Sequence, residues 1–282
     1  MAKKIVVTGG SGKAGRAIVR DLLEHGYDVL NVDLAPPAER LCPFLKADLC
    51  KQGEAFECLQ GSNAVVHMAA IPAPGLMTEE VTFRTNAEST FNVFAAAAAL
   101  RLERVVWASS ETTLGLPFDR EKPAFAPIDE THPLYPESSY ALSKVLGEEM
   151  ARQHNRWTGI PFIGLRFSNI MEPGDYNAFP SYWKDARLRK WNLWGYVDAR
   201  DVAQSARLGL QKDVSGAEAF IIAAADTVMN RPSAELLKEV FPSVHVRGKV
   251  GEFETLLSIG KARSLLGYAP RWSWRDLVKE TR

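Results

Sequence analysis

The chain has 282 residues, of which 46% are hydrophobic, enough for an ample core in one large domain or two interlocked ones. Lys plus Arg and Asp plus Glu each number 34, so the balanced charge lacks the basic excess that nucleic acid or an anionic membrane attracts. The longest apolar run, residues 94–100, is far too short to span a membrane, and the N-terminal residues contain no signal-peptide apolar region. The three cysteines have no partners at zinc-ligand spacing, so we expect reduced thiols, no metal site and a cytoplasmic enzyme.

Strand and helix patterns then alternate along the chain. Helices are expected at 14–26, in a polar stretch ending near Leu59, and at 82–101, 139–159 and 196–210. Short runs rich in β-branched residues predict strands at 3–9, 27–34, 44–49, 63–70, 104–110, 161–169 and 218–225. This alternation predicts an α/β fold with a Rossmann-type doubly wound parallel sheet, covered on both faces and joined by right-handed crossovers.

The rhythm breaks after Asn169. Residues 171–195 are rich in Pro, Gly and Trp, and only short helices and loops are expected from Thr227 to the end. We therefore expect two parts. Residues 1–170 plus 196–225 would form the dinucleotide-binding domain, and residues 171–195 plus 226–282 a small C-terminal substrate-binding cap.

A glycine-rich loop joins the first strand to the first helix. Gly9, Gly12 and Gly15 recur at intervals of three residues. This spacing suits a tight turn, a close backbone approach to a pyrophosphate and close helix–strand packing. The helix N-terminus adds unpaired N–H groups and a positive dipole end, so Lys13 and Ala14 within the loop join the glycines as candidate cofactor contacts.

The second strand ends in an acidic residue that bears on the choice of cofactor. Asp33 lies eighteen residues beyond Gly15, with no arginine directly after it. A carboxylate there accepts hydrogen bonds from both ribose hydroxyls and repels a 2′-phosphate, which favours NAD over NADP. Lys13 is the residue that would weaken this preference.

Several motifs in order resemble one family, the extended short-chain dehydrogenases/reductases, also called the NAD-dependent epimerase/dehydratase family. They include TGGSGKAG at 8–15, TNAESTFNV at 85–93, the Tyr-x-x-x-Lys of 140–144, RFSN at 166–169 and SIGKARSLLGYAP at 258–270. The resemblance implies that ADL at 47–49 lies near adenine, that the end of HMAA at 67–70 passes under the nicotinamide-side ribose, and that the family's structural asparagine is Asn86. The resemblance therefore implies further cofactor-binding residues, namely Asp48, Leu49, Ala69, Ala70, Asn86, Tyr140 and Lys144.

Tyr140 and Lys144 are four residues apart on one predicted helix, so they share a face. Alone, this spacing describes an ordinary exposed pair; with the resemblance it implies an acid/base device. A free tyrosine has a pKa of about 10, and a nearby ammonium lowers it. Tyr140 would take the proton of a substrate hydroxyl, Lys144 would hold the ribose, and Ser110 would orient the substrate oxygen, with Ser109 as the rival. His67 is interpreted as a core histidine.

The substrate site departs from the family pattern. Thr113-Leu114-Gly115 stands where the family often has Val-Tyr-Gly. Dehydratases usually carry two acids after the catalytic Thr, whereas here only Glu111 follows Ser110, which disfavours dehydration. The predicted substrate contacts are Ser110, Glu111, Asn169 and, from the aromatic and basic segment 181–201, at least one of Arg187, Arg189 and Trp191, with Arg187 as the main candidate.

Three functions remain open. The first is an NAD-dependent oxidoreductase acting on a sugar or sugar derivative, possibly a sugar or sugar-acid dehydrogenase, since the chain partly resembles uronate dehydrogenases. The second is a nucleotide-sugar 4-epimerase, like UDP-glucose 4-epimerase, that retains its NAD; a short cap speaks against it. The third is a non-catalytic NAD-binding sensor. By analogy with the family, a homodimer formed by the Asn86 and Tyr140 helices is expected, with a small-molecule substrate and neither nucleic acid nor membrane as partner.

Overall fold

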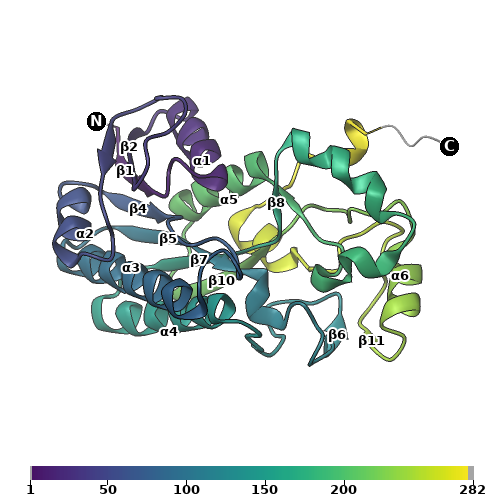
Figure 1. Ribbon diagram of the computed structural model, residues 1–282. Coiled ribbons are helices and arrows are strands. Elements are labelled where there is room, and N and C mark those ends of the chain that lie inside the picture. Colours follow the sequence, from purple (N-terminus) through teal and green to yellow (C-terminus); the bar gives the residue numbers. More distant parts are fainter. Residues whose placement is uncertain (1, 279–282) are drawn as a thin grey trace.

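The computed structural model describes residues 2–278 and contains a parallel sheet of seven strands in the order β10-β7-β5-β4-β1-β2-β3 (Figure 1). All seven strands were predicted from the sequence. Their bounds are β1 Lys4–Thr8, β2 Asp28–Asp33, β3 Phe44–Lys46, β4 Ala64–His67, β5 Arg104–Ser110, β7 Phe162–Phe167 and β10 Ala217–Ile222.

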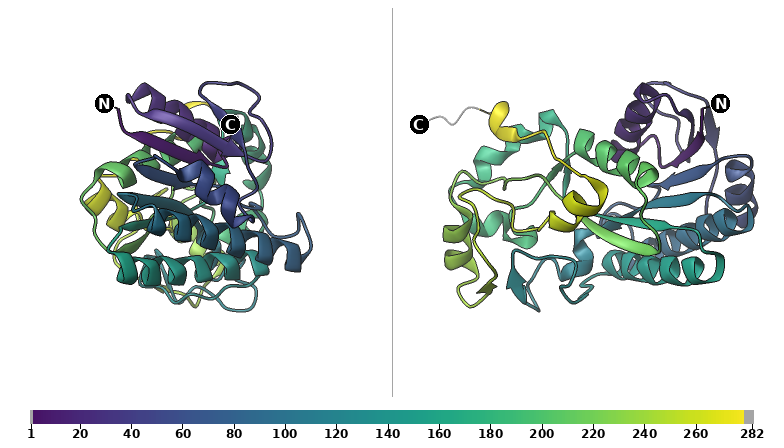
Figure 2. Two further views of the ribbon diagram at one scale, coloured as in Figure 1. Left: turned by 90° about the vertical axis from the view of Figure 1, so that its left-hand side faces the viewer. Right: turned by 180° about the vertical axis from the view of Figure 1, so that it is seen from behind.

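Helices cover both faces of this sheet, as Figures 1 and 2 show. On one face lie α1 (Lys13–Glu24) and α5 (Ala199–Gln211), and on the other α2 (Gln52–Leu59), α3 (Glu79–Ala99) and α4 (Ser139–Thr158). Neighbouring strand residues point to opposite faces, so Ile5 and Val7 pack with the α1 and α5 core while Val6 packs with the α3 and α4 core. The predicted doubly wound fold is confirmed.

The strands end earlier than the sequence pattern suggested. Residues 47–49, 68–70 and 168–169 were predicted as strand, but they leave the sheet at its carboxyl edge. All of them line the cavity described below. These residues therefore form part of the wall of a binding site.

Two hydroxyl side chains cap the long helices on the second face. The Thr78 hydroxyl accepts a hydrogen bond from Val81 N, so α3 begins three residues before the predicted start. The Ser138 hydroxyl accepts from Ala141 N at 3.1 Å, so α4 begins at Ser139 as predicted. No helix within residues 2–278 is both long and apolar enough to cross a membrane.

The second part of the molecule, on the right in Figure 1, has little regular structure. Its core is aromatic and includes Tyr176, Phe179, Trp194 and Trp274, all fully buried. Its elements are β8 Ile170–Met171 paired with β9 Val197–Asp198, the 3-10 segments Pro173–Tyr182, Ala186–Asn192 and Trp274–Asp276, α6 Ser233–Val240 and a π turn at Ala262–Leu266.

One segment before α4 belongs in space with this second part. β6 (Phe125–Ala126) pairs with β11 (His245–Val246), and Ile128 forms a bridge with Leu257. The sequence pattern predicts residues 125–128 in the dinucleotide-binding part, because nothing local signals a pairing 120 residues away along the chain. The exact division into two parts stays a prediction.

Gly147 marks a point of close contact between α4 and the sheet. A Cβ added there would lie 2.8 and 2.9 Å from ring atoms of Trp107 on β5. Gly147→Ala is therefore expected to lower the free energy of unfolding by roughly 1–3 kcal/mol through overpacking. Urea denaturation followed by circular dichroism measures this change.

The matched control is Gly53→Ala in α2. A Cβ at Gly53 meets nothing within 4 Å, and alanine favours a helix, so stability should stay level or rise. Equal effects of the two substitutions would contradict the packing argument.

Candidate active site

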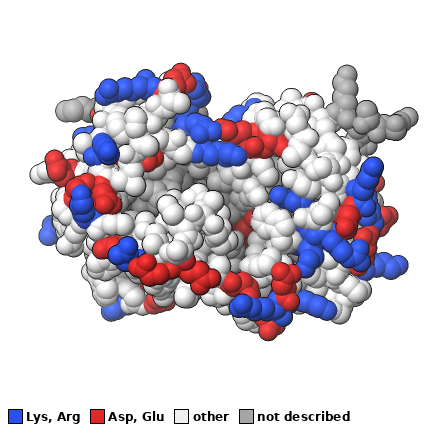
Figure 3. Space-filling model, viewed as in Figure 1, with Lys and Arg blue, Asp and Glu red and all other residues white. Residues whose placement is uncertain are grey.

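A cavity of about 1000 Å³ lies at the carboxyl ends of the strands, between the two parts. Figure 3 shows the hollow between the two halves, with largely uncharged walls. Parallel α/β sheets bind ligands at this edge. Of the predicted residues the cavity brings together Gly9, Gly12, Lys13, Ala14, Gly15, Asp33, Asp48, Leu49, Ala69, Ala70, Ser110, Glu111, Tyr140, Lys144 and Asn169. Asn86 and Arg187 are not in its wall.

The glycine turn has the shape that a diphosphate needs. Gly9 has a φ of 67°, and a Cβ at Gly15 would lie 2.1 Å from the Gly9 carbonyl oxygen, so larger residues do not fit. α1 begins at Lys13 with neither a side-chain cap nor an acidic residue in its first turn. Its N-terminus, which lines the cavity, thus offers N–H groups to an anion.

The carboxylate of Asp33 is fixed at the cavity wall. Ser11 N donates to its Oδ2 at 3.1 Å, and Leu34 N donates to its Oδ1 at 2.7 Å. Lys13 Nζ forms an ion pair with Asp175 Oδ2 at 2.6 Å, so its charge is met by a carboxylate of the second part. This arrangement fits a ribose without a 2′-phosphate at Asp33. Because Lys13 is paired with Asp175, it does not weaken the preference for NAD over NADP.

Asn86 acts through a loop and not from the cavity wall. Its Oδ1 accepts from Ile71 N at 2.8 Å, and its Nδ2 donates to Ile71 O at 3.1 Å. Residues 69–74, which follow β4, line the cavity. The predicted cofactor-binding role is therefore corrected to a positioning one, in line with the structural asparagine that the family resemblance implied.

Ser110, Tyr140 and Lys144 meet in the cavity from two elements, the end of β5 and the first turns of α4. The Ser110 hydroxyl accepts hydrogen bonds from Thr112 N at 3.2 Å and Thr112 Oγ1 at 2.9 Å. Lys144 Nζ donates to Ala108 O at 2.8 Å and lies 5.7 Å from the centre of the Tyr140 ring. The tyrosine and lysine predicted to share a helix face do share one.

Burial dominates the electrostatics of this pair. It raises the pKa of Tyr140 to about 12, against a smaller lowering by a hydrogen bond with Ser110. It also lowers the pKa of Lys144 to about 8. In the protein without a cofactor, removal from water therefore dominates both pKa values, and a lowering of the Tyr140 pKa by Lys144 beside a bound pyridinium stays a prediction.

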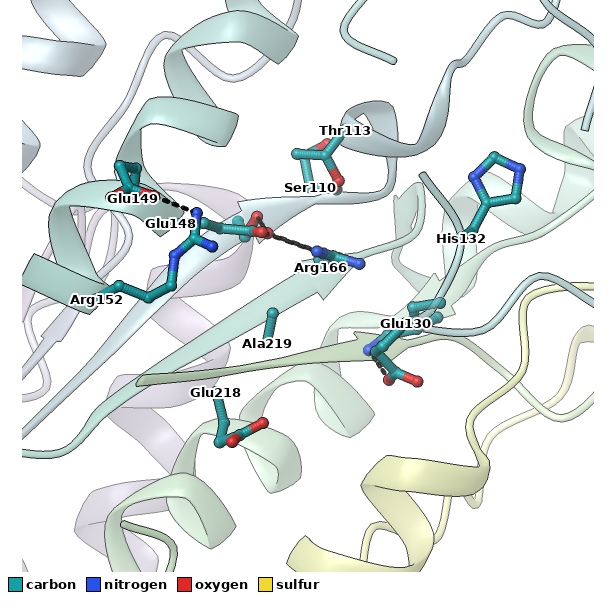
Figure 4. Close-up of polar contacts among 12 residues, drawn as sticks. Ser110, Thr113, Glu130, His132, Glu148, Glu149, Arg152, Arg166, Glu218 and Ala219 are labelled. Atoms are coloured by element: carbon teal, nitrogen blue, oxygen red, sulfur yellow. Dashed lines mark hydrogen bonds and ion pairs between the residues drawn. The ribbon is translucent and has the colours of Figure 1, made fainter. Parts of the chain in front are cut away.

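The Ser109 side chain is hydrogen-bonded in the interior, whereas Ser110 contributes to the candidate catalytic group in the cavity. Its hydroxyl donates to Glu148 Oε1 at 2.7 Å, and Arg166 Nε and Nη2 each donate to the Glu148 carboxylate at 2.8 Å. Figure 4 shows Glu148 reaching from α4 toward Arg166 on β7, next to the end of β5. This buried network joins the helix of Tyr140 to the strand of Ser110, and sequence reasoning missed it.

Glu111 lies directly after Ser110 and is only 3% exposed. Asn192 Nδ2 donates to its Oε1 at 3.3 Å. Burial raises the pKa of Glu111 to about 7, while Ser168, Asn192, Arg189 and the Asn169 N–H lower it by less. A buried carboxyl beside candidate catalytic residues is typical of a functional site.

The three substrate-contact candidates of segment 181–201 lie in different environments. Trp191 lines the cavity. The Arg187 side chain is 64% exposed and lies 3.9 Å from Asp185 and 3.8 Å from Glu239 in weak ion pairs, so it faces solvent. Arg189 is buried, with its guanidinium 4.8 Å from the centre of the Trp191 ring. The direction of an arginine in an irregular segment follows from tertiary packing, which the sequence does not show.

His67 is a core residue, as interpreted from the sequence. It is buried, its Nδ1 is 2.7 Å from Thr8 Oγ1, and its Nε2 is 3.3 Å from Thr90 Oγ1. Burial lowers its pKa to about 3, so the ring is neutral at pH 7.

Comparison with known proteins agrees with this site. Residues 5–223 match the model of the NAD dependent epimerase/dehydratase family. The chain belongs to this family. Its resemblance to the family, and the choice of NAD as cofactor, are thereby confirmed, and the family's members use the cofactor that the glycine turn and Asp33 fit.

Relatives differ in what they are named for. A putative UDP-glucose 4-epimerase of Methanocaldococcus jannaschii is 32% identical, with 98% of this chain and 96% of that protein covered. A short-chain dehydrogenase/reductase superfamily protein of Agrobacterium tumefaciens, solved with bound NAD, is 25% identical with a TM-score of 0.74, covering 96% of this chain and 93% of that one. The UDP-glucose 4-epimerase of Thermotoga maritima, solved with UDP-glucose, is 21% identical with a TM-score of 0.72, covering 96% and 94%, which shows a shared fold.

Removal of Glu148 tests the buried network. Glu148→Ala leaves Arg166 without its carboxylate in the interior, so the free energy of unfolding should fall by roughly 3–5 kcal/mol. Glu149→Ala is the matched control, because Glu149 pairs with Arg152 on the surface of the same helix (Figure 4). That change should be worth about 1 kcal/mol or less. Urea denaturation measures both, and similar losses would show that the network does not hold the helix.

Proposed function

We propose that the protein is an NAD-dependent dehydrogenase that oxidises a hydroxyl group of a sugar or sugar derivative. The observation that carries this proposal is the convergence of Ser110, Tyr140 and Lys144 in one cavity with the glycine turn and Asp33. The cavity is also large enough for a dinucleotide end and a small substrate together. A hydroxyl compound is the substrate class that this acid/base group suits.

In the proposed mechanism NAD, when bound, supplies the acceptor for the hydride. Ser110 donates its hydroxyl proton in a hydrogen bond to the substrate oxygen and orients it. Tyr140 in its phenolate form takes the proton of the substrate hydroxyl, and in the reverse direction the phenol returns that proton to the carbonyl oxygen. Positioned acid/base groups of this kind contribute roughly 10²–10⁴-fold.

Lys144 keeps the phenol ready for this proton transfer. Its ammonium is held by Ala108 O at 2.8 Å, one helical turn beyond Tyr140. Positive charge near the phenol opposes the effect of burial on its pKa. Lys144 lines the cavity and is only 5% exposed, so its side chain is largely removed from solvent.

Two other functions remain as alternatives. The 32% identity to a putative UDP-glucose 4-epimerase favours a nucleotide-sugar 4-epimerase that retains NAD. NAD that stays bound through purification, without net NADH production, would support that function over the dehydrogenase. A non-catalytic NAD sensor is disfavoured because the complete Ser110, Tyr140 and Lys144 group lines the cavity.

Tyr140→Phe tests the proton transfer. Loss of the phenolic hydroxyl should lower kcat at least 100-fold while NAD binding stays within a few-fold, because the ring itself is kept. Initial rates are followed at 340 nm, and NAD binding by calorimetry. Tyr27→Phe, whose hydroxyl accepts from Gln211 on the surface, is the control and should keep full activity. Near wild-type turnover in Tyr140→Phe would overturn the proposed role.

Asp33→Asn tests cofactor choice. The change keeps the side chain's size but removes the charge that repels a 2′-phosphate, so the ratio of the NADP to NAD dissociation constants should fall at least tenfold. Calorimetric titration with both dinucleotides measures it. Asp28→Asn, at the exposed start of the same strand, is the control, and an unchanged ratio in Asp33→Asn would contradict the assignment.

A homodimer is proposed on exposed apolar side chains of α3 and α4. Phe91, Leu142, Leu146 and Trp157 are each 39–60% exposed. Leu142 and Leu146 lie one turn apart on the same face of α4. Such exposed apolar surface is typical of interfaces.

The double substitution Leu142→Glu and Leu146→Glu should convert a dimer to a monomer, because burying unpaired charges at an interface costs too much free energy. Size-exclusion chromatography with light scattering measures the mass. Leu265→Glu, at an exposed leucine of the second part, is the control and should leave the mass unchanged. A monomeric wild type would refute the proposed dimer.

A further inference from the structure

The substrate end of the cavity contains a buried carboxylate with an unmet hydrogen-bonding site. Glu111 lines the cavity one residue beyond Ser110. Asn192 donates to Oε1 at 3.3 Å. Ser168 and the Asn169 N–H lie near the carboxyl group, but no hydrogen bond of ordinary geometry reaches Oε2 among the described residues. A buried oxygen without a donor costs free energy. A ligand that donates a hydrogen bond supplies the missing partner.

Positive charge is scarce in the same wall. Among the described residues that line the cavity, the cationic side chains are Lys13 and Lys144, and no arginine is among them. Lys13 is paired with Asp175 at 2.6 Å, and Lys144 donates to Ala108 O beside Tyr140. Neither cation is left to bind a second anionic group beyond the cofactor.

The arginines nearest this end are engaged elsewhere. Arg189 lies with its guanidinium 5.2 Å from the centre of the Tyr182 ring and 4.8 Å from that of Trp191, and it donates to Gly195 O at 3.1 Å. Its positive charge attracts the Glu111 carboxyl group. Arg187 faces the carboxylates of Asp185 and Glu239.

We propose that the substrate end of this cavity takes a neutral, hydroxyl-bearing ring such as a free aldose, one hydroxyl of which donates to Glu111. The site then discriminates against uronates, sugar phosphates and nucleoside diphosphate sugars. An added carboxylate or phosphate would meet the like charge of Glu111, and it would lack the arginine that such groups bind bidentately in proteins. The inference rests on the proposed function and names its substrate class.

A matched panel of sugars tests it. The purified protein with NAD is assayed at 340 nm and pH 8 with neutral aldohexoses, the corresponding uronic acids, the 6-phosphates and the UDP-sugars. We expect kcat/KM for the best neutral sugar to exceed that of each matched anion at least tenfold. Preference for any anionic member over its neutral counterpart would overturn the inference.

Binding is measured separately, by calorimetric titration of the NADH-loaded protein with the same panel. A neutral sugar that binds more tightly than its anions, yet yields no NADH with NAD, would refute the proposed dehydrogenase and support this inference. Tighter binding of an anion would refute the inference, and turnover of that anion would leave the dehydrogenase standing. The two failures are thus distinguishable.

Glu111→Gln tests the residue itself. The change keeps the size of the side chain and removes its charge, so the preference for a neutral sugar over its uronate should fall about tenfold. Glu239→Gln, the same change in the second part away from the cavity, should leave that ratio unchanged. An unchanged ratio in Glu111→Gln would contradict the role of Glu111, and the wild-type panel decides the substrate class even if this variant does not fold.

Discussion

The buried contact between Glu148 and Arg166 is the constraint on which the site depends. It joins α4 to β7, and the Ser109 hydroxyl extends it to β5. Tyr140 and Lys144 lie two turns and one turn before Glu148 on the same helix, and Ser110 directly follows Ser109. One interior network therefore links the elements that carry the three groups.

The same geometry explains why the chemistry gathers in one place. Every sheet strand runs in the same direction, so the residues that follow β1, β2, β3, β4, β5 and β7 all emerge at one edge. The glycine turn and Asp33 come from one half of the sheet, and Ser110 and Asn169 from the other. The second part, with its aromatic core, closes this edge and adds Trp191 to the wall.

Site features that depend on residues close together in the sequence could be predicted. Those that depend on contacts between residues far apart in the sequence could not. The glycine turn, Asp33 and the Tyr140–Lys144 pair follow from local order along one loop or one helix. Glu111 and Asn192 are 81 residues apart, and Arg166 and Glu148 have no pattern that pairs them. The direction of Arg187 and the effect of burial on the pKa of Tyr140 depend on tertiary packing, which local sequence patterns do not show.

A crystal structure of the protein with NAD tests the central claim most directly, namely that Tyr140 and Ser110 act beside the reactive end of the dinucleotide. The account predicts the diphosphate at the N-terminus of α1, the adenine ribose at Asp33, and the nicotinamide end between Lys144 and Tyr140. Density for the nicotinamide end away from Tyr140, or no dinucleotide at the glycine turn, would contradict it.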